Sequence, residues 1–468
     1  MASPAMRVHC RMQRFRDILL QYTVDSGDIP MTFRHEAQAL ALEQQILAHR
    51  PLKVDVSWAD EMVFPSYGGL SLKNIPHTMA ELLGAPTPNA APLDEAVWGG
   101  ERPTKHIQRV VGFLLDGMGY RHLMMLVEED EEIRQLVHDL TDGRGPMPLT
   151  SVAPSTTAVA LTTLWTGAAP GEHGIAGTHT YLREAAMIGD MLGFRPVPGK
   201  SAPDTFAAWG LSAMDLVTVP GVCEHLMSHG VQTHLVLHHM LTNTGLSRIL
   251  HRGVGKIHTH LGYADFHLRI RDALRATQGQ RAYVSIYWPG MDSIAHAYGA
   301  HTPYSAAEIK AQLLALRDIV RDTSLSDGHT LLMIMADHGH YDSLQPISLS
   351  HEHAAPILKG LALSLTGDER FAYAYVREGH RARILDAIQT HYADQLAVVD
   401  TQAAMEAGLF GDPAQFSAEA PYRFGDLVLI PRLGYRILDA VLPPTNLVSV
   451  HAGLDAWEML VPLMWTMF

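Results

Sequence analysis

The sequence predicts an α/β fold with a mainly parallel central sheet, and two observations predict it. Short apolar runs recur beyond residue 108, each of the length and composition expected for a strand buried on both faces: 110–115, 233–237, 282–287 and 331–335. Stretches of helical character lie between these runs: 158–165, 266–276 and 306–320. Alternating strands and helices favour a parallel sheet whose strands are joined by helices.

Bulk composition is that of a soluble globular protein with a large core. The chain has 468 residues, of which 47% are hydrophobic and 18% charged, and its mean hydropathy is +0.02. No apolar run approaches the roughly 18 residues that span a bilayer. The first residues are interrupted by arginines and lack the apolar segment of a secretory signal. We therefore expect a cytoplasmic protein without a membrane partner.

The charge of the chain limits its partners. A formal net charge of -14 argues against nucleic acid as a bulk partner, because there is no basic surface to neutralise phosphates. An anionic substrate would need a local positive centre, which bound divalent metal ions can supply. Two cysteines are too few for a thiolate zinc site.

Acidic and imidazole side chains follow three of the predicted strands. Asp116 follows the first, Asp292 and His296 follow the third, and Asp337 and His338 follow the fourth. Ligands bind beyond the carboxyl ends of the strands in such folds. A single aspartate at such a place is more often a cap or turn residue. Three carboxylates at one sheet edge would repel one another unless cations neutralise them, so together they favour a metal site.

The spacing of these residues suits metal binding. Asp292 and His296, four residues apart, share one face of a helical turn. Mixed carboxylate and imidazole ligands suit zinc, with manganese or iron as other candidates. His340 follows the cluster closely, and either support of a ligand or a solvated loop position would explain it.

A candidate nucleophile lies where the helix at 158–165 begins. Thr156 and Thr157 both stand at this start, and a helix N-terminus favours a bound phosphate through its free N–H groups. Either threonine could instead be a simple helix cap. A threonine hydroxyl is a poor nucleophile by itself, so metal coordination would have to activate it.

Taken together, the motifs resemble those of the alkaline phosphatase superfamily, and within it the type I phosphodiesterase/nucleotide pyrophosphatase family and its bacterial relatives. They occur in the family's order over most of the chain, at residues 114–117, 153–158 with 166–167 and 170–175, 287–296, 336–339, and 450–454 with 458–462. The resemblance implies an alkaline-phosphatase-like three-layer sandwich with a mainly parallel central sheet and a smaller inserted α+β lobe. It implies a metal-binding catalytic domain at 51–340 and 441–468, the lobe at 341–440, and an N-terminal extension at 1–50. Within the lobe, 370–375, 381–391 and 397–399 are expected to form a β-α-β unit.

The resemblance also assigns roles to residues. Thr157 would be the nucleophile, because it keeps the family's distance to Thr166 and Gly167. The metal ligands would fall into two sets, Asp116, Asp337, His338 and the Thr157 oxygen for one ion, and Asp292, His296 and His451 for the other. Thr178 stands where the characterised diesterases have an asparagine that binds a phosphate oxygen. No arginine near Thr157 matches the phosphate-binding arginine of the monoesterases, which favours diesters.

The sequence therefore predicts a hydrolase of small phosphorylated substrates that cleaves phosphodiester or pyrophosphate bonds. It would use two divalent metal ions and a phospho-threonine intermediate on Thr157. The alternatives are a phosphomutase or phosphonate hydrolase on the same fold, since fold does not settle reaction, and a zinc-binding protein without turnover.

Overall fold

The computed structural model describes residues 33–468 apart from 104–106, 198, 200, 343–344, 350–351 and 439–445. Of the expected N-terminal extension, residues 1–32 lie outside the described residues. The helical stretch expected at 33–49 forms helix α2 (Glu36–Ala48).

A seven-stranded sheet forms the centre of the larger part of the molecule, in the order β2-β18-β9-β1-β8-β6-β7. Its strands are β1 (Arg109–Leu115), β2 (Met147–Thr150), β6 (Gln232–His238), β7 (Lys256–His260), β8 (Ala282–Trp288), β9 (Thr330–Met335) and β18 (Leu460–Met467). Neighbours pair in parallel except at β18, which is antiparallel to both β9 and β2. The predicted α/β fold with a mainly parallel sheet is confirmed.

Burial explains which strands the sequence revealed. Every residue of β1 and β9 is buried, so each reads as a continuous apolar run. The edge strand β7 has three exposed residues among its five and carries no such run. It was not predicted.

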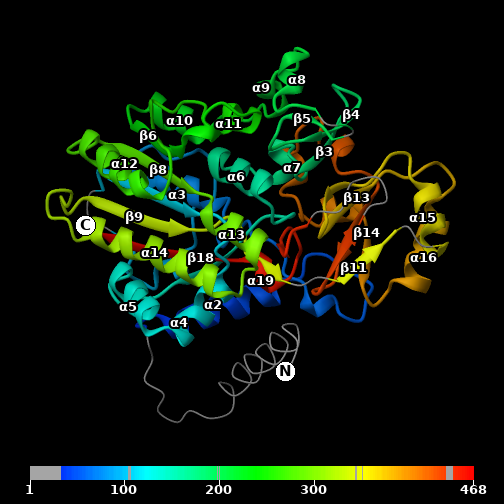
Figure 1. Ribbon diagram of the computed structural model, residues 1–468, viewed down its shortest axis with the longest axis horizontal. Coiled ribbons are helices and arrows are strands. Elements are labelled where there is room, and N and C mark those ends of the chain that lie inside the picture. The colour runs from blue at the N-terminus through cyan, green and yellow to red at the C-terminus, as the bar shows by residue number, and fades with distance from the viewer. Residues whose placement is uncertain are drawn as a thin grey trace, which may run out of the picture.

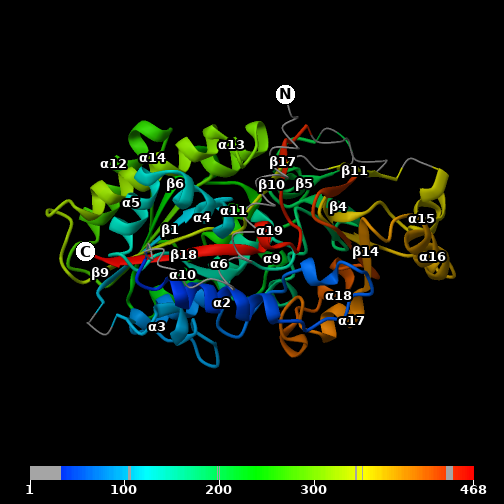
Figure 2. The same cartoon turned by 90° about the horizontal axis from the view of Figure 1, so that it is seen from below.

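Helices cover both faces of this sheet, which Figure 2 shows between two helical layers. One layer contains α4 (Tyr120–Glu129), α5 (Glu131–Leu140), α12 (Tyr263–Ala276), α13 (Gly290–Tyr298) and α14 (Pro303–Val320). The other contains α2, α3 (Asn74–Leu82), α6 (Thr157–Thr166) and α10 (Val222–Ser228), with α11 (Gly245–Leu250) against α6. None of the described helices is both long and apolar enough to cross a membrane.

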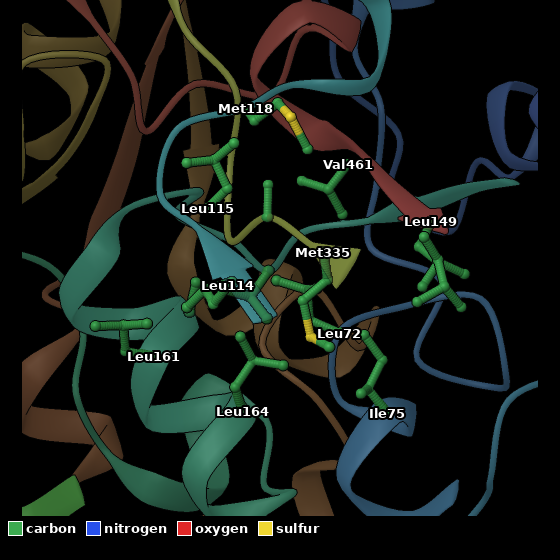
Figure 3. Packing of buried hydrophobic residues seen from close by; sticks show 14 of the residues in the cluster. Leu72, Ile75, Leu114, Leu115, Met118, Leu149, Leu161, Leu164, Met335 and Val461 are labelled. Carbon is green, nitrogen blue, oxygen red and sulfur yellow. The ribbon is translucent and has the colours of Figure 1, made fainter. Parts of the chain in front are cut away.

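Helix α6 is held against the sheet by its apolar side chains. Leu161 and Leu164 belong to the buried cluster that includes Leu114 of β1 and Met335 of β9 (Figure 3). The helix ends at Gly167, whose φ of 73° is the left-handed conformation typical of a helix stop. This packing fixes the N-terminus of α6 beside the carboxyl ends of β1 and β9.

A second seven-stranded sheet lies at the other side of the molecule, in the order β14-β15-β13-β12-β3-β4-β5 (Figure 1). Its strands are β3 (His179–Leu182), β4 (Met187–Asp190), β5 (Arg195–Pro196), β12 (Thr366–Asp368), β13 (Phe371–Ala374), β14 (Leu396–Asp400) and β15 (Leu427–Pro431). All its pairs are antiparallel. Strands β3 to β5 come from the segment after α6, so this sheet joins two parts of the chain that the sequence did not connect.

The elements of the expected β-α-β unit are present as β13, α16 (Arg381–His391) and β14, but β15 lies between the two strands. A separate apolar core fills this part of the molecule. The remaining elements are short: β10 (Tyr341–Asp342), β11 (Gln345–Ser348), β16 (Tyr435–Leu438), β17 (Ser449–Val450), α7 (Pro170–His173), α8 (Thr205–Ala208), α9 (Ala213–Leu216), α15 (Ala355–Gly360), α17 (Thr401–Glu406), α18 (Ala420–Arg423) and α19 (Ala456–Met459).

Candidate metal centre and active site

The candidate site lies at the carboxyl ends of three adjacent strands. Strand β1 pairs with β8 on one side and β9 on the other, so the residues that follow these strands meet at one edge of the sheet. Asp116 follows β1, Asp292 lies in the first turn of α13 after β8, and Asp337 follows β9. The topology therefore brings together three carboxylates that are far apart in sequence.

Asp116, Asp337 and His338 form a first buried cluster with ligand atoms within 4.8 Å of one another. Nε2 of His338 lies 3.4 Å from Oδ1 of Asp116 and 3.4 Å from Oδ2 of Asp337. Neither carboxylate oxygen has a hydrogen-bond partner. Nδ1 of His338 is 3.1 Å from the Gly339 carbonyl, which can only accept, so Nδ1 carries the proton and Nε2 presents its lone pair to the acids.

The carboxylates of Asp116 and Asp337 and the imidazole of His338 are all buried, and together they fit a bound cation. Burial raises the pKa of Asp116 well above its usual range, and the charges of Asp337 and Asp292 raise it further. Burial likewise raises the pKa of Asp337. The hydroxyl of Tyr287 donates to the other oxygen of Asp116. The backbone N–H groups of Gly117 and His338 donate to the other oxygen of Asp337. Because one oxygen of each buried carboxylate still lacks a donor, the set matches a divalent metal ion.

Asp292, His296, His340 and His451 form a second cluster. The Nε2 atoms of His296, His340 and His451 lie 3.2, 2.9 and 3.7 Å from the same oxygen of Asp292. Nδ1 of His296 is 2.8 Å from the Ser449 carbonyl, and Nδ1 of His451 is 3.2 Å from the Ser155 carbonyl. These carbonyls fix both tautomers with the Nε2 lone pair facing Asp292.

The second cluster also has strongly shifted pKa values. Burial would raise the pKa of Asp292, but the neighbouring imidazoles of His296 and His340 hold it well below its usual range. Burial, together with the charges of His338 and His340, lowers the pKa of His451 far below that of a free histidine. A neutral imidazole beside an ionised carboxylate is the state in which both bind a metal ion.

His340, which the sequence left open between a supporting and a solvated position, is 2% exposed. Its Nε2 is 2.9 Å from Asp292, and its Nδ1 is 3.1 Å from Oγ of Ser449. It is therefore not a solvated loop residue. Its position two residues after His338 was the only sequence signal for its role.

The two clusters adjoin. The ring of His338 stacks on that of His451, with centroids 3.8 Å apart and an interplanar angle of 17°. His338 follows β9 and His451 follows β17, so residues 113 positions apart in the sequence share one wall.

Thr157 lies against the first cluster. It is the first residue of α6, and its Oγ1 is 3.0 Å from Nε2 of His338. Thr156 occupies the N-cap position, but its side chain makes no capping hydrogen bond and lies 3.2 Å from Oγ1 of Thr178. Of the two threonines, the structure thus brings Thr157 to the cluster and turns Thr156 towards Thr178.

Known families provide the context for this arrangement. The model of the type I phosphodiesterase/nucleotide pyrophosphatase family matches residues 110–455. The chain belongs to this family. The predicted membership and the predicted class of hydrolase are confirmed. No curated protein sequence matches the chain.

Solved structures of family-like hydrolases share the fold. Murine ectonucleotide pyrophosphatase/phosphodiesterase 5 superposes with a TM-score of 0.53 at 16% identity, over 76% of this chain and 87% of the other. An inactive variant of the murine protein in complex with AMP gives 0.52 at 15% identity, over 76% and 87%. Phosphonoacetate hydrolase from Sinorhizobium meliloti 1021 with phosphonoacetate gives 0.53 at 14% identity, over 77% and 89%.

A pocket of about 400 Å³ opens beside the clusters. Thr157, Asp292, His296 and His451 line it. The second sheet and its neighbouring loops also line it, with Thr178, Asp368 and Glu369 among leucine, isoleucine and valine side chains. The sequence did not single out this acidic pair, because it lies in a segment with no motif.

Proposed function

We propose that this family member hydrolyses phosphodiester or pyrophosphate bonds of a small substrate, with Thr157 as nucleophile and two divalent metal ions as cofactors. The contact of Thr157 Oγ1 with Nε2 of His338, where the two clusters and the pocket meet, is the observation that carries the proposal. It is the one hydroxyl group of α6 that faces both an ion-binding set and open space.

The ligands divide as the family resemblance implies. Asp116, Asp337, His338 and the Thr157 oxygen would hold one ion, and the second would be held by Asp292, His296 and His451. Zinc suits these carboxylate and imidazole donors best, although manganese or iron could also bind. Bound there, the ions supply Lewis-acid stabilisation of the attacking and leaving oxygens.

The protein's own groups then carry the reaction through two displacements. Oγ1 of Thr157 forms a bond to phosphorus as the bond to the leaving oxygen breaks, and the Thr157 proton passes to water. The leaving oxygen takes up a proton from water. A water molecule then attacks the phospho-threonine and restores the Thr157 hydroxyl. The hydroxyl of Thr178, on the pocket wall, would bind a non-bridging phosphate oxygen.

The charge of the pocket supports a diester over more highly charged substrates. None of the described residues that line it is a lysine or arginine, whereas Asp292 and Asp368 are acidic and a third acid, Glu369, is paired with Arg436. A phosphodiester carries one negative charge, while a phosphomonoester or a carboxylated phosphonate carries more. The structural neighbour that binds phosphonoacetate makes phosphonate hydrolysis the second candidate.

Replacement of Thr157 tests the proposal. We expect Thr157→Ala to lower kcat for an aryl phosphodiester by at least about 10⁴-fold while two metal ions per chain are retained. Thr156→Ala, which removes the neighbouring hydroxyl, should lose about tenfold at most. Undiminished turnover by the Thr157 variant would refute the nucleophile, and product analysis with an alcohol acceptor separates hydrolase from mutase. A zinc-binding protein without turnover would hydrolyse none of the aryl phosphodiester, phosphomonoester and phosphonate substrates.

A further inference from the structure

Asp368 lines the same pocket as the nucleophile, although no motif marks it. It is the last residue of β12 in the second sheet. Its Oδ2 accepts a hydrogen bond from the backbone N–H of Thr178 at 3.1 Å, and its Oδ1 accepts from the hydroxyl of Thr156 at 3.4 Å. The carboxylate thus touches the residue before the nucleophile and the residue that would bind phosphate.

The surrounding backbone leaves Asp368 little freedom. A Cβ atom at Gly177 would come within 2.8 Å of the Cα of Gly367 and 2.9 Å of Oδ2 of Asp368. Residue 177 must therefore be glycine for β12 to approach the start of β3 this closely. The carboxylate is held at a fixed place beside Thr178.

The contacts of Asp368 favour a negative charge there. Both are donors, and donors stabilise the ionised form of a carboxyl group. Burial raises the pKa of Asp368, and the hydrogen bond from Thr178 opposes that rise. None of the described lysines or arginines forms an ion pair with Asp368, whereas the neighbouring Glu369 is paired with Arg436 at 3.2 Å.

A charge count indicates what this carboxylate does. Three aspartates and two divalent ions leave the metal centre with a net charge of about +1, which one diester anion balances. A second charge on the phosphoryl group would have no partner in the metal centre, and Asp368 lines the same pocket. Like charges a few ångströms apart in a protein pocket repel strongly enough to change affinity by about tenfold or more.

We propose that Asp368 is a specificity-determining residue that disfavours phosphoryl groups carrying two negative charges, so that phosphodiesters are accepted and phosphomonoesters rejected. This inference rests on the proposed function. With Asp368 in this role, the pocket can distinguish diesters from monoesters although no arginine lines it.

The experiment compares an aryl phosphodiester with the matching aryl phosphomonoester in the zinc-loaded enzyme. Asp368→Asn keeps the shape and can still bond Thr156 and Thr178, so we expect the monoester-to-diester ratio of kcat/KM to rise about tenfold or more, chiefly through a lower KM for the monoester. Asp368→Glu, which keeps the charge, should leave the ratio low. Glu369→Gln is the matched control and should change the ratio by less than about threefold, because Glu369 is already paired.

A binding measurement separates this inference from the proposed function. In zinc-loaded Thr157→Ala protein, Asp368→Asn should tighten calorimetric binding of inorganic phosphate about tenfold at pH 8 and change that of dimethyl phosphate by less than about threefold. Asp368→Ser serves as a second neutral variant if Asp368→Asn fails to fold. Equal effects on both anions, or an unchanged ratio, would overturn the role of Asp368. If Asp368→Asn tightens phosphate binding as expected but the wild-type enzyme cleaves neither ester, the proposed function fails and the selection against two charges stands.

Discussion

The two seven-stranded sheets of this hydrolase differ in construction and in what they bring to the site. The main sheet is mainly parallel, and its strands β1 and β9 are buried along their whole length. Its carboxyl ends carry Asp116, Asp292 and Asp337. The second sheet is antiparallel, is assembled from two separate segments and provides the wall with Asp368. The proposed metal ligands, which need fixed geometry, thus lie mainly beyond the ends of buried parallel strands, while the residue proposed to select the substrate lies on the second sheet.

A buried ion-pair network joins the parts of the molecule that contain the two sheets. Arg370, directly before β13, lies 2.5 Å from Asp455 and 2.5 Å from Glu458, which stand just before β18 of the main sheet. Glu458 also accepts from the backbone N–H of Gly453, two residues after His451. The position of His451 therefore depends on both sheets.

The largest expected effect lies on the main sheet. Asp292→Ala and His451→Ala should each reduce bound zinc from two ions towards one per chain and lower diester turnover by at least about 10³-fold, because each removes a ligand of the second cluster. Metal analysis of dialysed protein gives the stoichiometry. Asp190→Ala, on β4 of the second sheet, is the control that should keep both ions. Full retention of two ions by both ligand variants would show that the assignment of ligands is wrong.

The next largest effect is expected for the ion-pair network of Arg370 with Asp455 and Glu458. Arg370→Ala leaves two buried carboxylates without their partner and should lower the free energy of unfolding by about 3–5 kcal/mol. Urea denaturation measures it. Arg183→Ala breaks an exposed pair with Glu419 in the same part of the molecule and should lower the free energy of unfolding far less. Similar losses in both variants would mean that the network does not join the sheets.

A smaller effect is expected at His340. His340→Gln removes the imidazole that contacts Asp292, and we expect affinity for the more weakly held ion to fall about 10- to 100-fold, as for other residues that orient metal ligands. Competition with a chromogenic chelator measures this affinity. His353→Gln replaces a histidine that belongs to neither cluster, and it should leave the affinity for metal unchanged. Unaltered affinity in His340→Gln would make His340 a packing residue only.

The smallest effect is expected on the substrate wall. Thr178→Val removes one hydroxyl at constant shape and should reduce kcat/KM for a diester about fivefold, the value of one neutral hydrogen bond. Thr178→Asn, which supplies an amide donor, should retain activity within that range. A loss of kcat/KM above about 100-fold in Thr178→Val would contradict this expectation, because it would mean that Thr178 contributes to catalysis as strongly as a metal ligand.

Local patterns in the sequence were sufficient for much of the main sheet. Four apolar runs became β1, β6, β8 and β9 with bounds within a residue or two, because strands buried on both faces leave a continuous apolar signature. Asp116, Asp337 and His338 stand directly after such runs, and Asp292 and His296 share a helical turn. Their convergence followed from the rule that parallel strands present their carboxyl ends at one edge.

Other features depended on contacts that no local pattern encodes. The addition of β3 to β12, the contact of His340 with Asp292 and the contact of Asp368 with Thr178 each join segments at least 48 residues apart. Which of Thr156 and Thr157 faces the candidate metal-binding residues depended on how α6 packs against the sheet through Leu161 and Leu164. The sequence by itself thus determined the four central strands of the main sheet and the acidic and imidazole residues that follow three of them, since periodicity and adjacency are short-range. Only the tertiary structure decided the pocket wall and the supporting contacts, because antiparallel pairing between distant segments depends on which surfaces the whole chain buries together.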